Sequence, residues 1–146
     1  MRRILQTLLI PVLALMLSAC GKKQDPVPVH EGPAEIAFKG IETVHDFGSF
    51  ERSKDRSHTF RFYNTGSEPL IVHEVSTGCS CMSAEWTKTP VAPGGSGTIK
   101  VTMLGNHLSI GTFDSSFTVH SNSKNGDFPL RVKGEVIRSA MKTQRR

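Results

Sequence analysis

The chain has 146 residues, which is about one domain's worth of sequence. Its formal net charge is +5, but two of its 18 basic residues stand at positions 2–3, which leaves 16 basic against 13 acidic residues in the rest. Much of this excess lies in residues 138–146, where a solvated or membrane-facing basic tail explains it better than nucleic-acid binding. We therefore expect no nucleic-acid partner.

Residues 1–19 have the layout of a secretory signal peptide. A basic pair precedes an apolar stretch over residues 4–17 that is too short to span a bilayer. The stretch ends in Leu17-Ser18-Ala19-Cys20, a tetrapeptide that resembles the bacterial lipobox. The resemblance implies cleavage before Cys20 and a covalent lipid, such as palmitate, on its thiol. The alternative is an ordinary signal peptide followed by a stray cysteine.

Residues 20–33 are predicted to form a flexible tether that follows the lipid. The segment holds three prolines and scattered charges, and it offers too little apolar surface to be buried. Partly extended, at about 3.1 Å per residue, it would lift the next domain some tens of ångströms from the membrane.

From Ala34 onward, apolar and polar residues alternate. The alternation is clearest in the segments 60–63, 99–103, 113–119 and 130–136. A period of two residues predicts half-buried strands, and no stretch has the period of a helix.

Turn-forming residues separate these segments, at 64–69, 92–97 and 121–126. Asn64 and Gly66 are expected to supply positive φ angles there. About seven short strands in roughly a hundred residues favour an all-β, immunoglobulin-like antiparallel β-sandwich over residues 34–137. An up-and-down barrel is the alternative architecture.

Cys79 and Cys81 are the sulfur atoms left to the folded domain if Cys20 is acylated. In an oxidising compartment they can bridge only to each other within one chain. A disulfide between them requires a turn, which Gly78 would permit. Such a pair would be structural, or it would exchange with other thiols as a redox site.

Metal binding is a further alternative for the same pair. On an extended strand, residues two apart face the same way, so both sulfurs could reach one soft ion such as Cu(I), or zinc. Met82, His73 and His107 are candidate further ligands. The four-ligand spacing typical of structural zinc sites is absent from the sequence, so we expect no resident metal or other cofactor.

Several short motifs, taken together, resemble the bacterial family known as domain of unknown function 1573. In chain order they are Asp46-Phe47-Gly48, residues 60–70, Cys79-Ser80-Cys81, Ala84-Glu85-Trp86 and residues 92–97. The similarity covers about Ile41 to Val136 and implies a secreted protein or lipoprotein with an immunoglobulin-like fold, without an assigned activity. The usual cysteine motif of the family, Ser-Cys-Gly-Cys-Thr, is altered here at Gly78, Ser80 and Met82.

The remaining polar and aromatic residues favour packing over catalysis. Trp86 is predicted to pack at the core or its rim rather than to bind a ligand. The six histidines have no short mutual spacing and are expected to be solvated. No nucleophile, base and acid can be brought together from the sequence, so we predict no enzymatic activity.

The sequence therefore predicts a lipoprotein anchored through Cys20 in the bacterial cell envelope. Gly21 follows the cysteine in place of the aspartate that retains some lipoproteins at the inner membrane, which favours the outer membrane. The domain is expected to act as a non-enzymatic binding or structural module with an envelope protein as its partner. A metal or thiol redox site at Cys79 and Cys81 is the alternative function.

Overall fold

The computed structural model describes residues 28–29, 31–39 and 43–139. The predicted signal peptide, Cys20, most of the tether and the tail from residue 140 lie outside the described residues. In the ranges that the structure describes, no helix is long and apolar enough to cross a membrane.

The described chain folds into eight strands and one short 3-10 helix. In chain order these are β1 (Ile36–Phe38), β2 (Val44–Glu51), β3 (Arg56–Asn64), β4 (Val72–Thr77), β5 (Met82–Trp86), β6 (Ser96–Met103), η1 (Gly105–His107), β7 (Gly111–Ser121) and β8 (Phe128–Ile137).

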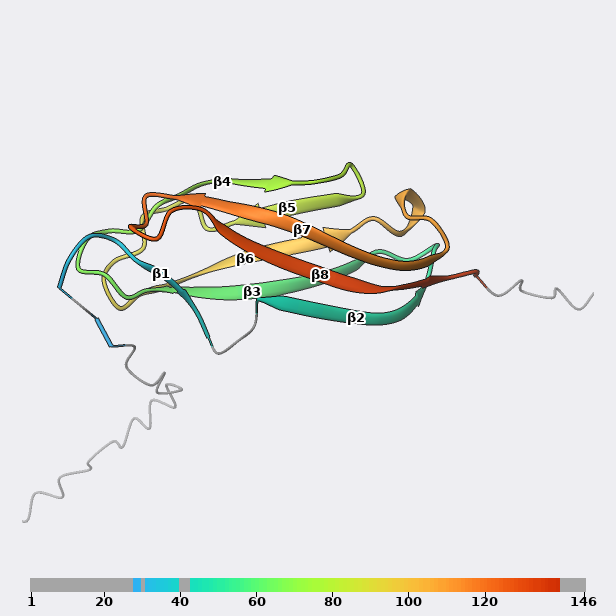
Figure 1. Ribbon diagram of the computed structural model, residues 1–146, viewed down its shortest axis with the longest axis horizontal. Helices are drawn as coiled ribbons and strands as arrows, with labels where there is room; N and C mark the ends of the chain where they lie inside the picture. The colour runs from blue at the N-terminus through green and yellow to red at the C-terminus, as the bar shows by residue number, and fades with distance from the viewer. Residues whose placement is uncertain (1–27, 30, 40–42, 140–146) are drawn as a thin grey trace, which may run out of the picture.

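The strands form two four-stranded sheets packed face to face, as Figure 1 shows. One sheet has the order β1-β3-β6-β5 and the other β2-β8-β7-β4. This is the arrangement of a constant-type immunoglobulin domain whose first strand is shared between the sheets. The predicted immunoglobulin-like β-sandwich is confirmed.

Two details differ from the prediction. The expected number of strands was about seven, and the eighth arises because the first strand is broken into β1 and β2, which belong to different sheets. In addition, β2 pairs with β8 in parallel, whereas the other strand pairs are antiparallel. The break places β2 in the second sheet beside the last strand, β8. These two strands run in the same direction, so they pair in parallel.

The core lies between the sheets and comes from the alternation seen in the sequence. The inward residues of β3 and β6, Phe60, Phe62, Ile99, Val101 and Met103, are at most 1% exposed. They meet Phe117, Val119, Leu130, Val132 and Val136 from β7 and β8, which are equally buried. Burial of this apolar surface is the main stabilising contribution to the fold.

The near end of the sandwich, defined here as residues 32–35, 64–67 and 123–125, is where the described chain first joins the sheets (Figure 1). Asn64 is fully buried, and its side-chain amide donates to the carbonyl oxygens of Glu68 (2.7 Å) and Val91 (2.9 Å). Its side-chain oxygen accepts the backbone N–H of Gly66 at 3.0 Å.

The expectation of positive φ angles at this turn is wrong for Gly66, which is not among the glycines with positive φ. A Cβ atom at Gly66 would lie 2.8 Å from the Cα of Ala34 and closer still to the carbonyl oxygen of Pro33. The glycine is therefore required for close backbone packing. Asn64 is the last residue of β3 and serves through its side chain.

Candidate functional site

The far end of the sandwich, opposite the near end in Figure 1, gathers four segments that are distant in sequence. They are the β2–β3 turn (residues 52–55), the β4–β5 turn (residues 78–81), η1, and the end of β8 with the two residues after it (residues 137–139). This end contains the cysteine pair, Cys79 and Cys81.

Hydrogen bonds join these segments around η1. The backbone N–H of Gly105 donates to the side chain of Asp55 (2.9 Å), and that of Leu104 donates to the carbonyl oxygen of Cys81 (2.8 Å). The backbone N–H of Arg52 donates to the carbonyl oxygen of Ile137 at 3.0 Å. The four segments therefore form one connected surface, although each is a loop or a strand terminus.

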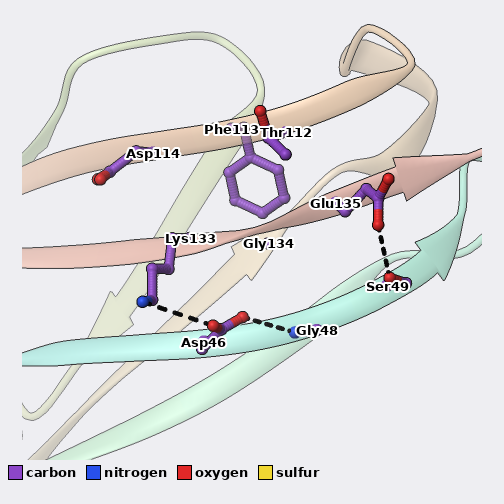
Figure 2. A pocket seen from close by; sticks show the side chains of 9 residues that line it. All are labelled: Asp46, Gly48, Ser49, Thr112, Phe113, Asp114, Lys133, Gly134 and Glu135. Atoms are coloured by element: carbon purple, nitrogen blue, oxygen red, sulfur yellow. Dashed lines mark hydrogen bonds and ion pairs between the residues drawn. The ribbon is translucent and has the colours of Figure 1, made fainter.

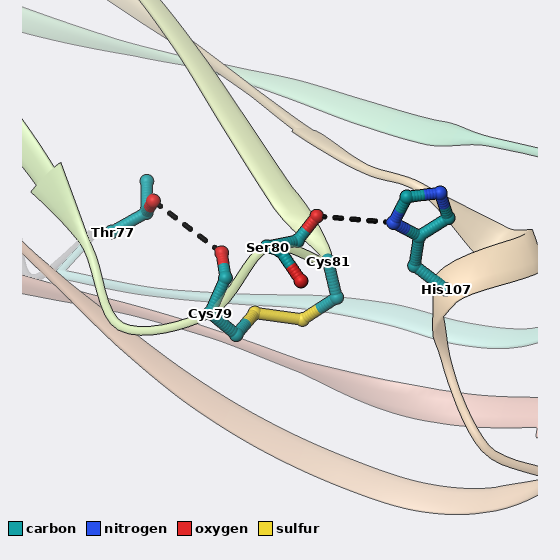
Figure 3. Close-up of a disulfide and its surroundings, with 5 residues drawn as sticks. All are labelled: Thr77, Cys79, Ser80, Cys81 and His107. Atoms are coloured by element: carbon teal, nitrogen blue, oxygen red, sulfur yellow. Dashed lines mark hydrogen bonds between the residues drawn. A yellow bond between two sulfur atoms is a disulfide. The ribbon is translucent and has the colours of Figure 1, made fainter.

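Cys79 and Cys81 form a disulfide in the β4–β5 turn, with their Cα atoms 5.2 Å apart (Figure 3). Both residues are half-buried and pack against the hydrophobic core. The turn also brings the backbone N–H of Met82 to 3.4 Å from the carbonyl oxygen of Cys79. Of the alternatives for this pair, the structure contains the disulfide, together with the turn that it requires.

The geometry considered for a metal ion differs from this arrangement. The two cysteines lie in a turn and not on an extended strand, and both sulfur atoms are committed to the disulfide. Met82 is buried in the core, whereas His107 lies beside the turn, its Nδ1 atom 3.2 Å from the carbonyl oxygen of Ser80 (Figure 3). His73 is exposed on β4. Among the described residues, no group of three or more His, Cys, Asp or Glu side chains could hold a metal.

Trp86 packs between the two edge strands on the side of the sandwich that carries the disulfide. Its indole N–H donates to the carbonyl oxygen of Val72 on β4 (3.2 Å), and the ammonium group of Lys88 lies 5.2 Å from the ring centroid. The ring is half-buried against the core. The predicted packing role at the rim of the core is confirmed.

Two of the histidines are closer than the sequence indicated. His45 on β2 and His58 on β3 stack with ring centroids 3.5 Å apart and an angle of 12° between their planes. Both are half-buried, and the rings of Phe47 and Phe60 contact the stack. The expectation of scattered, solvated histidines is therefore wrong for this pair, because β2 and β3 face each other across the two sheets.

A hollow of about 630 Å³ lies over the edge strand β2 and its neighbours β8 and β7 (Figure 2). It is present where the pairing of β2 shifts register between Asp46 and Ser49. The backbone N–H of Gly48, whose φ is +63°, donates to the Asp46 carboxylate at 2.8 Å. This bond is the main reason that the pKa of Asp46 lies below its usual value.

The acidic groups of this hollow each have a polar partner. The Asp46 carboxylate lies 3.6 Å from the ammonium group of Lys133, and the Ser49 hydroxyl donates to Glu135 at 2.8 Å. Asp114 pairs with Arg131, which lies on the same sheet. Asp46 and Asp114 are thus each paired with a cation, whereas Glu135 has a neutral hydroxyl as its partner.

The sequence matches the family described as "Protein of unknown function (DUF1573)" over residues 38–136. The chain belongs to the DUF1573 family. The match includes the disulfide turn and all strands except part of β1 and the last residue of β8. A search of the curated proteins finds no match for this DUF1573 chain.

Solved structures share the fold. A protein of unknown function from Porphyromonas gingivalis aligns with a TM-score of 0.59 and 17% identity, over 75% of this chain and 49% of that one. The ASH/PapD-like domain 7 of human CEP192 aligns with a TM-score of 0.61 and 10% identity, over 95% and 99%. The Vibrio cholerae VesB protease aligns over 70% of this chain and 31% of its own, with a TM-score of 0.53 and 15% identity.

At these identities the likeness shows the fold alone. This DUF1573 chain spans about half of the Porphyromonas gingivalis protein.

Proposed function

We propose that the protein is a lipid-anchored, non-enzymatic binding module of the bacterial cell envelope, and that the far end of its sandwich contacts an envelope protein. The observation behind the proposal is the separation of the two ends. The described chain joins the sandwich at the near end, whereas the four connected segments lie at the opposite end (Figure 1).

The attachment at the near end is firm. The Ser67 hydroxyl donates to the carbonyl oxygen of Gly32 at 2.7 Å, and the backbone N–H of Thr65 donates to that of Glu35 at 2.9 Å. The backbone N–H of Ile36 donates to the buried Ser123 hydroxyl oxygen at 3.0 Å. A lipid on Cys20, joined through residues 21–31, would therefore hold the near end toward the membrane and present the far end to the periplasm or the cell surface.

The lipid anchor is tested by metabolic labelling with a clickable fatty acid. The wild-type chain is expected to be labelled and to fractionate with the outer membrane, and Cys20→Ala is expected to abolish the label. Persistent labelling of Cys20→Ala would refute the anchor. Fractionation with the inner membrane would refute the assigned membrane but leave the anchor intact.

The role of the far end in partner binding is tested by photo-crosslinking in native cells. A photoreactive amino acid at Asn106, exposed on η1, is expected to give a discrete crosslinked species with an envelope protein. The same group at Asn125, which is exposed at the near end, is the matched control and is expected to give none. Equal crosslinking from both positions, or a species found only from Asn125, would refute the assignment of the far end.

Thiol exchange at the Cys79–Cys81 disulfide is a second candidate function, favoured by the exposed position of the β4–β5 turn at the far end. A partner dithiol would give two electrons and two protons to the disulfide, which becomes two thiols while the partner forms its own disulfide. Metal binding by the same sulfur atoms would require that reduction first. A Cys81→Ser variant is expected to trap a mixed disulfide through Cys79 in cells, and absence of any trapped species argues against exchange.

A further inference from the structure

A second hollow, of about 400 Å³, lies at the far end between the β2–β3 turn, η1 and the end of β8. Its lining residues are Arg52, Ser53, Asn106, Ile110, Arg138 and Ser139. Two guanidinium groups thus border one small opening, and like charges at one site repel each other unless an anion is present.

Neither arginine forms an ion pair with another residue in the described ranges. Arg52 makes one side-chain hydrogen bond, in which Nη2 donates to the carbonyl oxygen of Asn106 at 3.3 Å. Both side chains are exposed. A guanidinium has five N–H donors, so most of the donors at this opening remain available to a ligand.

The nearby carboxylates are engaged elsewhere. Glu51 lies 3.9 Å from the ammonium group of Lys54, and Asp55 accepts the backbone N–H of Gly105 at 2.9 Å. In the hollow over β2, β7 and β8, by contrast, Asp46 and Asp114 are each paired with a cation. The far-end hollow therefore has an excess of positive charge that its own residues do not neutralise.

Hydroxyl and apolar groups complete the lining. The Ser139 hydroxyl donates to the Ser53 hydroxyl oxygen at 2.8 Å, which leaves the proton of Ser53 for a further acceptor. Ile110 is 47% exposed and Ile137, adjacent to Arg138, is 42% exposed. One of the four large apolar side chains exposed in the described ranges, that of Ile110, therefore lines this opening, and Ile137 precedes a lining residue in the chain.

We propose that this hollow binds an acidic segment of a partner protein, in which a glutamate or aspartate carboxylate is flanked by apolar side chains. The carboxylate would be held by the guanidinium groups of Arg52 and Arg138 and by the Ser53 hydroxyl, since a guanidinium matches the planar carboxylate. A flanking apolar side chain would cover Ile110, which lines the hollow and is exposed. Arginine surrounded by apolar groups is typical of the residues that dominate protein interfaces.

The proposal rests on the proposed function in one respect, namely that the far end is the surface presented to a partner. It is tested on the purified full chain in a neutral detergent by NMR titration with a synthetic peptide, capped at both ends, of sequence Gly-Leu-Glu-Leu-Gly. We expect saturable shifts of the side-chain Nε–H signals of Arg52 and Arg138. The matched peptide with glutamine in place of glutamate is expected to bind at least about tenfold more weakly, because it lacks the charge.

Variants of the protein supply the second control. The double variant Arg52→Gln with Arg138→Gln is expected to weaken binding of the glutamate peptide at least about tenfold. Arg61→Gln removes an exposed arginine that bonds to Ser96 on the outer face of the other sheet, and it is expected to leave the affinity unchanged. Comparable weakening by Arg61→Gln would overturn the proposal in favour of non-specific attraction.

Three further outcomes also overturn it. These are absence of saturable shifts, equal binding of the glutamine peptide, and displacement by inorganic phosphate at the same concentration as the peptide, which would assign the hollow to a small anion. None of these outcomes bears on the lipid label or on the crosslink from Asn106. The failure of this proposal is thus distinguishable from that of the proposed function.

Discussion

The near and far ends of this sandwich are held together by different means. At the near end the fully buried side-chain amide of Asn64 forms hydrogen bonds with the backbone of three neighbouring segments. Gly66 allows its own segment to pack closely against the backbone of residues 33–35. At the far end, exposed loops are joined by a few backbone hydrogen bonds and by a disulfide that closes a very short loop. The near end is therefore held by buried polar contacts, whereas the far end has exposed side chains, such as those of Arg52 and Arg138, that form no ion pair among the described residues.

The largest effect is expected from Gly66→Ala. The new Cβ atom would overlap backbone atoms of residues 33–35, which cannot move without breaking the near-end hydrogen bonds. We expect a loss of about 4 kcal/mol or more in the free energy of unfolding, or failure to fold. Denaturant unfolding measures this, with Gly78→Ala as the control. A Cβ atom at Gly78 meets its nearest neighbour at 3.5 Å, so that variant should stay within about 0.5 kcal/mol of the wild type.

Asn64→Ala is expected to cost about 3 kcal/mol, because it leaves the buried carbonyl oxygen of Val91 without this donor and opens a cavity. The control is Asn125→Ala, whose exposed side chain donates to Glu35 at 3.2 Å and should contribute less than about 0.5 kcal/mol. If both variants lose similar stability in denaturant unfolding, the contrast between buried and exposed bonds at the near end is wrong.

Removal of the far-end disulfide should cost less. Cys79→Ser with Cys81→Ser opens a loop of only three residues, for which chain entropy predicts about 1.5 kcal/mol. Hydrogen exchange should rise locally at the N–H of Leu104, which bonds to the carbonyl oxygen of Cys81. Ser80→Ala keeps the disulfide and should change neither quantity. A loss in the double variant as large as that of Asn64→Ala would remove the distinction between the two ends.

The smallest effect on stability is expected from Asp46, which lies on the edge strand β2. The Gly48 N–H lowers the pKa of its carboxyl group in the folded state, so this group stabilises the fold above the usual value of 3.8, and the contribution is lost as the pH falls through the lowered pKa. Unfolding measured from about pH 5 to about pH 2 should therefore show a shallower loss of stability in Asp46→Asn than in the wild type. Identical slopes would contradict this role for Asp46.

Much of the fold could be predicted because a half-buried strand has alternating apolar and polar residues in its own sequence. The alternation at Phe60–Phe62 and Ile99–Met103 reappears as inward-facing residues of β3 and β6. The break of the first strand could not be predicted, because the partners of β1 and β2, which are β3 and β8, lie far from them in the sequence. The prediction of a positive φ angle at Gly66 was wrong, because the close packing of Gly66 against residues 33–35 cannot be inferred from the residues around position 66.

For the candidate site, the sequence identified the cysteine pair and little else. The turn that permits the disulfide depends on the change of sheet between β4 and β5, and His107 reaches it from η1. No sequence motif marks Arg52 as a site residue, and the sequence pattern places Arg138 in the basic tail. They line one hollow only because β2 and β8 run in parallel to the same end.

The sequence alone determined that this chain is all-β, because strand periodicity and turn residues are properties of short segments. Its motifs resemble those of the DUF1573 family, and the family match over residues 38–136 agrees with that resemblance. The sequence also supplied the prediction of a lipid on Cys20, which depends on a local motif. The tertiary structure decided which distant residues meet, such as Ser53 and Ser139, which are 86 positions apart and 2.8 Å from each other. Such contacts depend on strand order and on the change of sheet after β1, and no single segment encodes either.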